Sequence, residues 1–206
     1  MNKNLGNKDY EDRDEYYSTL DTAERLLVNI TAKHLQDKVV YCNCDGPESE
    51  IYKLLKERFS MYKIKKLVAT KYVDCGHGMN TSFDGLHETI EEMSGDGSYR
   101  CQESEDLLNE CDVVVTNPPF SKLCDYIPFV MQHDVDAVLI VNMMAMMYKS
   151  IFPYTMAGRF CGCSRFSGGA TFKRPSGDVA RVRSLGITTF LDACTKPKLF
   201  KYITVQ

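Results

Sequence analysis

The hydrophobic pattern in the first two thirds of the chain predicts short strands that alternate with helices. Apolar residues recurring every three or four positions are typical of an amphipathic helix, and short β-branched runs bounded by turn residues are typical of buried strands. Helices are predicted at residues 19–35, from Pro47 or Glu48 through Phe59, at 103–109 and at 122–132. Strands are predicted at residues 39–41, 65–73, 112–116 and 137–141.

The last third of the chain predicts further β structure, at residues 160–163, 171–174 and 187–191. Between the two parts, residues 74–97 are rich in glycine and acids and predict a loop with at most one helical turn, and residues 98–101 predict a short strand. Alternating strands and helices indicate an α/β fold with helices on both faces of the sheet. We therefore expect a mostly parallel sheet with an antiparallel C-terminal edge.

Length and composition predict one globular domain. The chain has 206 residues, of which 44% are hydrophobic and 26% charged, a profile that is ordinary for a folded domain. Residues 1–15 are largely polar and charged, so we expect a flexible N-terminal segment there and a single domain over residues 16–206.

The polar N-terminus also lacks the apolar stretch of a signal peptide. The longest apolar run, residues 137–148, is interrupted by Asn142 and is too short to span a bilayer. These features predict a cytoplasmic protein whose nine cysteines are thiols. Close pairs such as Cys42 and Cys44 have one residue between them, whereas structural zinc sites use about two to four, so no metal site is predicted.

Charge is distributed unevenly along the chain. The net charge is -3, but the part from Lys149 onward holds ten basic and two acidic residues, against fifteen basic and twenty-six acidic residues before it. Such asymmetry is typical of a basic face that contacts an acidic partner, and the alternative is an ordinary solvated surface. The basic, β-rich part from about residue 149 is therefore a candidate nucleic-acid surface.

The sharpest chemical signal is Asn117-Pro118-Pro119-Phe120, hereafter the NPPF motif, which follows a buried strand. Ligands of open α/β sheets bind at such strand ends. The exocyclic amine of adenine is a poor nucleophile because its lone pair is delocalised into the ring. The Asn117 carboxamide oxygen and the Pro118 carbonyl could each accept one N–H bond and free that lone pair to attack a methyl sulfonium. Pro119 would stiffen the loop and Phe120 would stack on a flipped-out base. The alternative is a proline-stiffened turn.

The run DVVVTNPPFS resembles motif IV of the amino-group DNA methyltransferases, and the wider chain resembles the EcoRI-type adenine methylases. VVYCNCDGPESEIYKLL is similar to that branch's cofactor loop, and FKRP and SLGITTFLD also have counterparts there. The resemblance implies a Rossmann-like S-adenosylmethionine-dependent methyltransferase fold. It also implies a site-specific, adenine-specific DNA methyltransferase that methylates N6 of adenine by direct transfer, in a bacterium or a phage-infected cell.

The same resemblance implies which residues bind S-adenosylmethionine. Tyr16, Tyr17 and Ser18, preceded by Asp14 and Glu15, look like the N-terminal motif that contacts the methionine part. Asn43, Asp45 and Gly46 occupy the place of the Gly-rich cofactor loop, in which Glu48 stands where the last glycine is expected. Asn117 also borders this site. The acid expected after the second strand, to bind the ribose hydroxyls, is not evident; Asp74 lies near. The acid after the third strand is Glu103 or Asp96.

The tail supplies the candidate nucleic-acid contacts, which are Arg165, Lys173, Arg174, Arg181 and Arg183. In an enzyme acting on DNA these side chains would contact phosphates and fix the register. A specificity partner and a cognate restriction enzyme are further expected partners, since little of the chain follows Asp192 where enzymes of this branch carry recognition segments.

Two other functions stay open at this level. The chain could methylate an RNA amine or a protein glutamine, because the motif also serves such enzymes. It could also be a non-catalytic nucleic-acid-binding descendant of the fold, which the altered cofactor loop favours and the intact NPPF motif disfavours.

Overall fold

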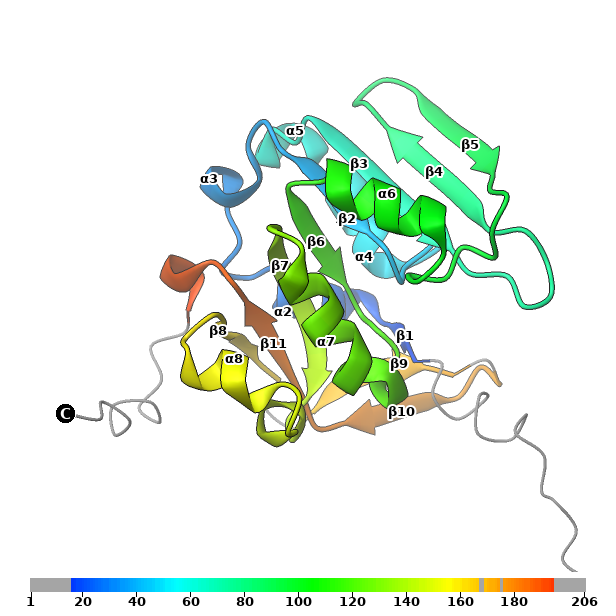
Figure 1. Ribbon diagram of the computed structural model, residues 1–206. Helices are drawn as coiled ribbons and strands as arrows, with labels where there is room; N and C mark the ends of the chain where they lie inside the picture. The colour runs from blue at the N-terminus through cyan, green and yellow to red at the C-terminus, as the bar shows by residue number, and fades with distance from the viewer. Residues whose placement is uncertain (1–15, 167–168, 175, 195–206) are drawn as a thin grey trace, which may run out of the picture.

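The computed structural model describes residues 16–166, 169–174 and 176–194 (Figure 1). The expected flexible segment 1–15, with Asp14 and Glu15 of the N-terminal motif, lies outside the described residues, as do residues 195–206. The strands are β1 (Tyr17–Ser18), β2 (Val39–Cys42), β3 (Lys66–Lys71), β4 (Met79–Phe83), β5 (Glu88–Glu92), β6 (Val113–Thr116), β7 (Asp136–Asn142), β8 (Cys161–Arg165), β9 (Ala170–Lys173), β10 (Val179–Val182) and β11 (Ser184–Thr188). The α-helices are α2 (Leu20–Leu26), α3 (Ala32–Leu35), α4 (Glu50–Glu57), α5 (Phe59–Tyr62), α6 (Gln102–Glu110), α7 (Leu123–Gln132) and α8 (Phe152–Met156). Short 3-10 helices are η1 (Phe120–Lys122), η2 (Ala145–Met147) and η3 (Leu191–Ala193).

An eight-stranded mixed sheet forms the centre, in the order β5-β4-β3-β2-β6-β7-β11-β8. The four central strands, β3, β2, β6 and β7, are parallel. β4 and β5 extend one edge in antiparallel fashion, and β11 and β8 extend the other. The α/β prediction and the antiparallel C-terminal edge are confirmed, but the sheet is mixed at both edges rather than mostly parallel.

Helices cover both faces of this sheet. In Figure 1, α6 and α7 lie on the near face, and α2 and α4 lie behind it. Successive residues of the central strands serve the two layers alternately: Val113 and Val115 pack in the core with α2 and α4, whereas Val114 packs with α6 and α7. Burial on both faces explains why these strands are continuous apolar runs in the sequence.

A second sheet of three antiparallel strands, β1-β9-β10, lies below the carboxyl ends of β6 and β7 in Figure 1. Its pairing fixes the beginning of the described chain to its last third, since Tyr17 is opposite Lys173 and Ser18 is opposite Phe172. Thr19 and Thr22, at the start of α2, strengthen this connection through hydrogen bonds to Thr171. The N-terminal motif is therefore held against the end of the sheet that carries the NPPF motif.

Residues 74–97 form the β4–β5 hairpin, so the predicted loop is wrong. The strand signal was weak because every residue of β5 is exposed and three of its five residues are glutamates, which are rare in strands. Backbone pairing to β3 orders β4 instead. The turn is built by Asp84, whose carboxylate accepts the N–H groups of Leu86 and His87, and by Gly85 at φ +101°.

Two further local predictions also need correction. The single helix predicted over residues 19–35 is two helices, because the chain turns at Asn29, whose amide donates to the Cys163 carbonyl at 2.6 Å, and α3 begins at a capping box of Thr31 and His34. Residues 98–101 form a turn rather than a strand, since the Ser98 N–H bonds to Asp96 and α6 begins directly after Cys101.

The structure joins Cys161, in β8, to Cys194, after η3, in a disulfide with Cα atoms 5.7 Å apart. The prediction that all cysteines are thiols is wrong for this pair; the other seven are free. The two partners are 33 residues apart in sequence, and only the turn after β11 brings them together. Among the described residues there is no helix long and apolar enough to cross a membrane.

The segment after β5 packs closely against the end of β3 at Gly97. Its φ is +76°, and a β-carbon there would overlap the carbonyl oxygen of Lys71. Gly177 has a similar φ of +86° but has open space around it. Both substitutions to alanine pay the left-handed cost of about 1–2 kcal/mol, and Gly97→Ala adds a steric term of roughly 1–3 kcal/mol.

We therefore expect Gly97→Ala to lower the free energy of unfolding clearly more than Gly177→Ala, as measured by urea denaturation. Equal losses for the two variants would contradict this close backbone packing.

Candidate active site

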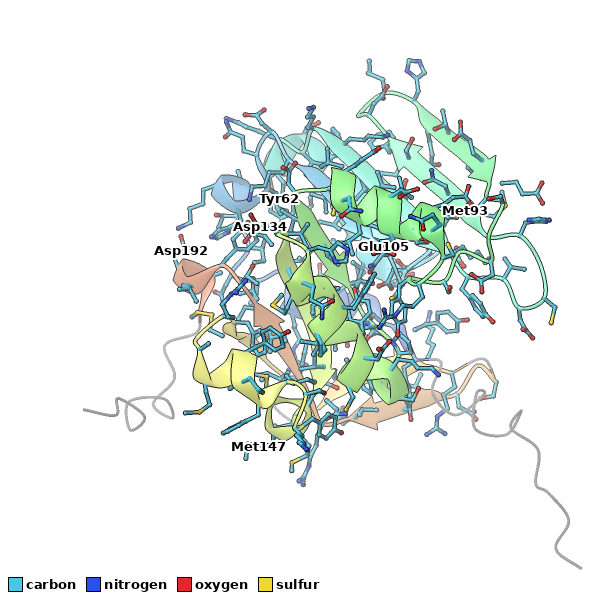
Figure 2. All side chains as sticks on the ribbon, in the orientation of Figure 1. Tyr62, Met93, Glu105, Asp134, Met147 and Asp192 are labelled. Carbon is cyan, nitrogen blue, oxygen red and sulfur yellow. A yellow bond between two sulfur atoms is a disulfide. The ribbon has the colours of Figure 1, made fainter. Side chains whose placement is uncertain are left out.

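The candidate site lies where β2 and β6 end. The chain leaves β2 for β3 on one side and later returns to β6 on the other, so the loops after these adjacent parallel strands diverge. Such a reversal of strand order at the carboxyl ends is where α/β sheets bind ligands. In Figure 2, Met147 lies near the carboxyl ends of the central strands, and Asp134 and Asp192 lie at the opposite end.

Asp45 ties the loop after β2 to the NPPF motif. Its Oδ2 accepts the Thr116 hydroxyl at 2.6 Å and the Asn117 backbone N–H at 2.7 Å. The side chain is buried, and burial raises the pKa of Asp45 to about 6, although both donors oppose that rise. Removing the carboxylate would leave two buried donors without partners, each at a cost of about 1–3 kcal/mol. Asp45 therefore acts here as a brace for the motif.

The Asn117 side chain has a defined orientation. Its Nδ2 donates to the Tyr16 carbonyl at 2.6 Å, which an amide oxygen could not do, so Oδ1 must face the other way. Oδ1 is buried and has no hydrogen-bond partner among the described residues. A buried acceptor without a partner is costly and uncommon in a native fold. The site therefore presents a fixed, unsatisfied amide oxygen.

Three aromatic rings border this amide. Tyr16, Phe120 and Phe172 form a triangle with ring centroids 5.6–5.7 Å apart. Phe172 is fully buried, while Tyr16 and Phe120 are partly exposed. The Arg174 guanidinium lies 5.9 Å from the centre of the Tyr16 ring. The site thus has an apolar wall with one cation at its rim, of which sequence reasoning missed Phe172, since one phenylalanine in a strand gives no signal of this role.

The rest of the NPPF motif leads into η1. Pro118 is buried and Pro119 is partly exposed. The Pro119 carbonyl accepts the Lys122 N–H at 3.0 Å, which begins η1. The two prolines therefore connect the strand to a helical turn that presents Phe120.

The other residues predicted to bind the cofactor differ in their surroundings. Ser18 is buried, and its Oγ lacks a hydrogen-bond partner among the described residues. Tyr17 is about half exposed, at 47%. Asn43 is buried and already engaged, since its side-chain oxygen accepts the Tyr126 hydroxyl and its carbonyl accepts the Thr70 hydroxyl. Gly46 lies beneath the Glu48 carboxylate, whose Oε2 would be 2.5 Å from a β-carbon at this position.

The two candidate acids for contacting the cofactor's adenine, Glu103 and Asp96, bond to the loop between β5 and α6 and not to the NPPF motif. Glu103 accepts the Ser94 hydroxyl and the Gly95 N–H, each at 2.8 Å, and so fixes the loop after β5. Asp96 accepts the Ser98 N–H. A role for Glu103 in cofactor binding stays a prediction.

The predicted basic residues do not form one cluster. Lys173 and Arg181 are exposed on the same face of the three-stranded sheet, because they lie at positions opposite Val179 and Thr171, whereas Arg174 turns toward Tyr16. Arg183 is exposed between β10 and β11. Arg165 ends β8 opposite Leu185.

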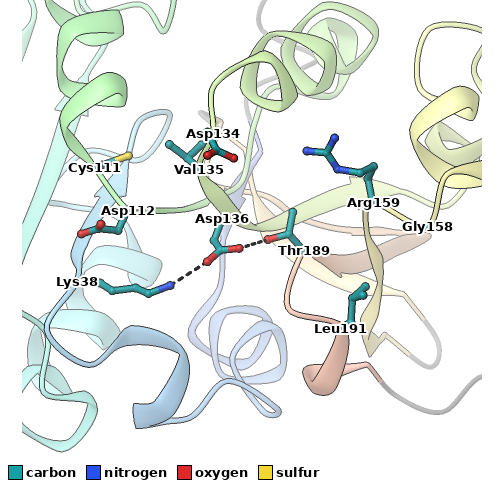
Figure 3. A pocket seen from close by; sticks show the side chains of 10 residues that line it. All are labelled: Lys38, Cys111, Asp112, Asp134, Val135, Asp136, Gly158, Arg159, Thr189 and Leu191. Carbon is teal, nitrogen blue, oxygen red and sulfur yellow. Dashed lines mark hydrogen bonds and ion pairs between the residues drawn. The ribbon is translucent and has the colours of Figure 1, made fainter.

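A cavity of about 480 Å³ lies at the opposite end of the central strands, where β2, β6 and β7 begin (Figure 3). Asp136, in its lining, accepts both Lys38 Nζ at 2.8 Å and the Thr189 hydroxyl at 2.9 Å. It is remote from the NPPF motif and is not part of the candidate site. Within residues 16–166, 169–174 and 176–194, no group of three His, Cys, Asp or Glu side chains is placed to hold a metal ion.

Comparison with known proteins identifies the family. The family model described as "Adenine-specific methyltransferase EcoRI" matches residues 4–94 and 77–186. Type II methyltransferase M.EcoRI of Escherichia coli is 34% identical over 160 residues, which cover 68% of this chain and 48% of that protein. Type II methyltransferase M.MgeORF184P of Mycoplasma genitalium is 30% identical over 141 residues, 68% of this chain and 44% of that protein.

A third relative, Type II methyltransferase M.MpnI of Mycoplasma pneumoniae, is 34% identical over 116 residues, 56% of this chain and 36% of that protein. The chain thus spans about half the length, or less, of the curated relatives it matches. No solved structure gives a significant match.

The buried Asp45 carboxyl predicts a specific pH dependence of stability. Its folded pKa of about 6 lies above the ordinary value of 3.8, so its contribution to stability is fully present below about pH 3.8 and is lost as the pH rises through about 6. In Asp45→Asn the amide oxygen can accept the same two donors but does not titrate.

From pH 4 to pH 7, we expect the free energy of unfolding of the unmodified protein to fall. The fall should exceed that of Asp45→Asn by roughly 2–3 kcal/mol. Denaturant titrations at both pH values measure the difference. Parallel pH profiles for the two proteins would show that Asp45 is not buried in this way.

Proposed function

The chain belongs to the EcoRI family of adenine-specific methyltransferases, and on this premise we propose that it transfers the methyl group of S-adenosylmethionine to N6 of adenine in DNA. The single observation that carries the proposal is the Asn117 amide oxygen, which is buried, fixed by Tyr16 and without a hydrogen-bond partner in the part of the chain that the structure describes. An acceptor in this state fits an incoming N–H donor, and the exocyclic amine of adenine supplies one.

Asn117 and Pro118 would act on that amine together. Two acceptors placed on the two N–H groups draw the nitrogen toward tetrahedral geometry and localise its lone pair. Asp45 holds the Asn117 backbone and Tyr16 holds its side chain, so little reorganisation accompanies binding. Attack of the amine on the methyl carbon would break the carbon–sulfur bond and leave a neutral thioether and a positively charged amine, which would then lose one proton to water. No nucleophilic cysteine is needed.

The aromatic wall fits a base taken out of the duplex. Phe120 is partly exposed beside Asn117 and offers a ring face, with Tyr16 and Phe172 supporting it. Stacking of a flipped base on an aromatic ring contributes about 1–3 kcal/mol. The same wall excludes water from the apolar side of the base.

The strand order supports a Rossmann-like S-adenosylmethionine-binding fold, since the loops after β2 and β6 diverge at the candidate site. The cofactor supplies an electrophilic methyl group on a sulfonium. Tyr16, Tyr17 and Ser18 would hold its methionine part. This role fits the buried Ser18 hydroxyl, which has no hydrogen-bond partner among residues 16–166, 169–174 and 176–194. The loop of Asn43, Asp45 and Gly46 would line the other side. In this proposal residues 16–206 act as the methyltransferase domain.

The exposed cations of the three-stranded sheet would contact the DNA backbone. Lys173 and Arg181 share a face, and Arg174 lies at the rim of the aromatic wall. Phosphate contacts of this kind position the duplex and carry little sequence information. The relatives are named Type II methyltransferases. We therefore propose that a restriction enzyme with the same target sequence accompanies this chain.

Asn117→Ala tests the chemistry directly. Incubation with methyl-labelled S-adenosylmethionine and unmethylated DNA, followed by mass spectrometry of the nucleosides, should give N6-methyladenine with the unmodified protein. The variant should lose about a hundredfold or more in rate, the loss typical of one preorganised hydrogen-bonding group. Asn142→Ala removes another amide, bonded to Tyr148 beyond the motif, and should keep most of the activity.

A product in RNA or on glutamine, with none in DNA, would overturn the proposed substrate. Equal activity of Asn117→Ala and the unmodified protein would overturn the proposed role of the motif.

Arg181→Ala tests the basic face. Because each phosphate contact releases about one counterion, we expect weaker DNA binding and a slope of log affinity against log salt reduced by about one. Lys65→Ala removes an exposed cation just before β3, at the end of the parallel strands opposite the candidate site, and should leave that slope unchanged. Fluorescence anisotropy across a salt series measures both, and identical slopes for the two variants would exclude this face as the contact.

A further inference from the structure

Glu48 places a second carboxylate at the edge where β2 and β3 end. It follows the cofactor loop and immediately precedes the Ser49 cap of α4. Its Oε1 pairs with Lys71 Nζ, at the end of β3, at 2.9 Å, and both side chains are 48% exposed. The ion pair therefore joins the loop after β2 to the end of β3 and remains accessible from solvent.

The carboxylate is folded back over Gly46. A β-carbon at Gly46 would lie 2.5 Å from Oε2 and 3.1 Å from Oε1, so any larger residue there would displace the carboxylate. Oε2 has no hydrogen-bond or ion-pair partner in the described part of the chain. Lys71 thus fixes one oxygen of Glu48 and leaves the other available above the backbone of the loop.

The remaining acids at this edge are already engaged. Asp45 accepts Thr116 and Asn117, and Glu103 accepts Ser94 and Gly95. Asp74, the acid nearest after β3, is exposed in a turn, where its Oδ1 accepts the Tyr72 hydroxyl and the Cys75 thiol. Of these carboxylates, only Glu48 combines a position over the cofactor loop with a free oxygen.

A ribose presents two neighbouring hydroxyl donors, and α/β sheets that bind nucleotides usually meet them with a carboxylate at the end of the second strand. Here that position, the end of β3, holds Lys71. In this chain the acid comes instead from the loop after β2, where small residues are usual, and Lys71 fixes it through the ion pair. The carboxylate therefore lies one loop away from its usual position.

We propose that Glu48, positioned by Lys71, binds the ribose hydroxyls of S-adenosylmethionine. This assignment rests on the proposed function, since it requires that the chain bind this cofactor. It predicts that the chain binds a ligand with both ribose hydroxyls more tightly than one without them, and that this preference depends on Glu48.

Binding rather than catalysis tests the assignment. Calorimetry would measure the affinity of the full chain for S-adenosylhomocysteine and for its 2′,3′-dideoxy analogue, which lacks both hydroxyls. The unmodified protein should prefer S-adenosylhomocysteine by about tenfold to a hundredfold, the range for hydrogen bonds to a charged acceptor. Glu48→Gln should lose about tenfold in affinity for S-adenosylhomocysteine and bind the analogue almost as before. Asp74→Asn is the matched control and should keep the full preference.

Each outcome separates the two ideas. A preference kept by Glu48→Gln would overturn the assignment, and a preference lost in Asp74→Asn would move the role to the acid after β3. If the unmodified protein binds neither compound, the proposed function fails together with this inference. Thermal denaturation of Glu48→Gln should match that of the unmodified protein, because the side chain is half exposed.

Discussion

A buried carboxylate that two strand ends must share sets the arrangement of the whole site. Asp45 leaves β2 and accepts donors from the last residue of β6 and from the residue after it. A buried charge is tolerated only when donors surround it, so this one holds the two loops in a single register. The position of Asn117 follows from that register, and the position of Phe120 follows from the two prolines that separate them.

The small three-stranded sheet completes what the large sheet begins. Pairing of β1 with β9 brings Tyr16 to Asn117, 101 residues away, and brings Phe172 to the same place. One side of the site therefore comes from the central strands, and the other comes from the two ends of the described chain. Distant segments are joined by backbone pairing and by Thr22 and Thr171 rather than by a long connecting helix.

The sequence foretold the parts of this fold that are buried on both sides. The bounds of β2, β3, β6 and β7 were predicted within about two residues, because a short continuous apolar run is typical of a strand buried on both faces. α4, α6 and α7 were predicted for the same reason, from their one-sided apolar faces. The hairpin of β4 and β5 was missed because exposed strands carry no apolar alternation.

Contacts between residues far apart in the chain could not be predicted from the sequence. The motif identified Asn117, but only coordinates show that the Tyr16 carbonyl orients its amide. The disulfide of Cys161 and Cys194 and the ion pair of Glu48 and Lys71 join residues whose separation along the chain gives no signal. Each depends on which strands become neighbours.

The exposed hairpin has a consequence for how the molecule behaves in a crowd of its own copies. β5 borders the sheet with its outer row of N–H and C=O groups directed away from β4, and such an edge is a template for another strand. Glu88 is paired with Lys56, but Glu91 and Glu92 also lie in this strand, so two molecules that approach edge to edge bring like charges together. The glutamates that concealed this strand from sequence analysis therefore also disfavour its pairing with a second copy of the chain.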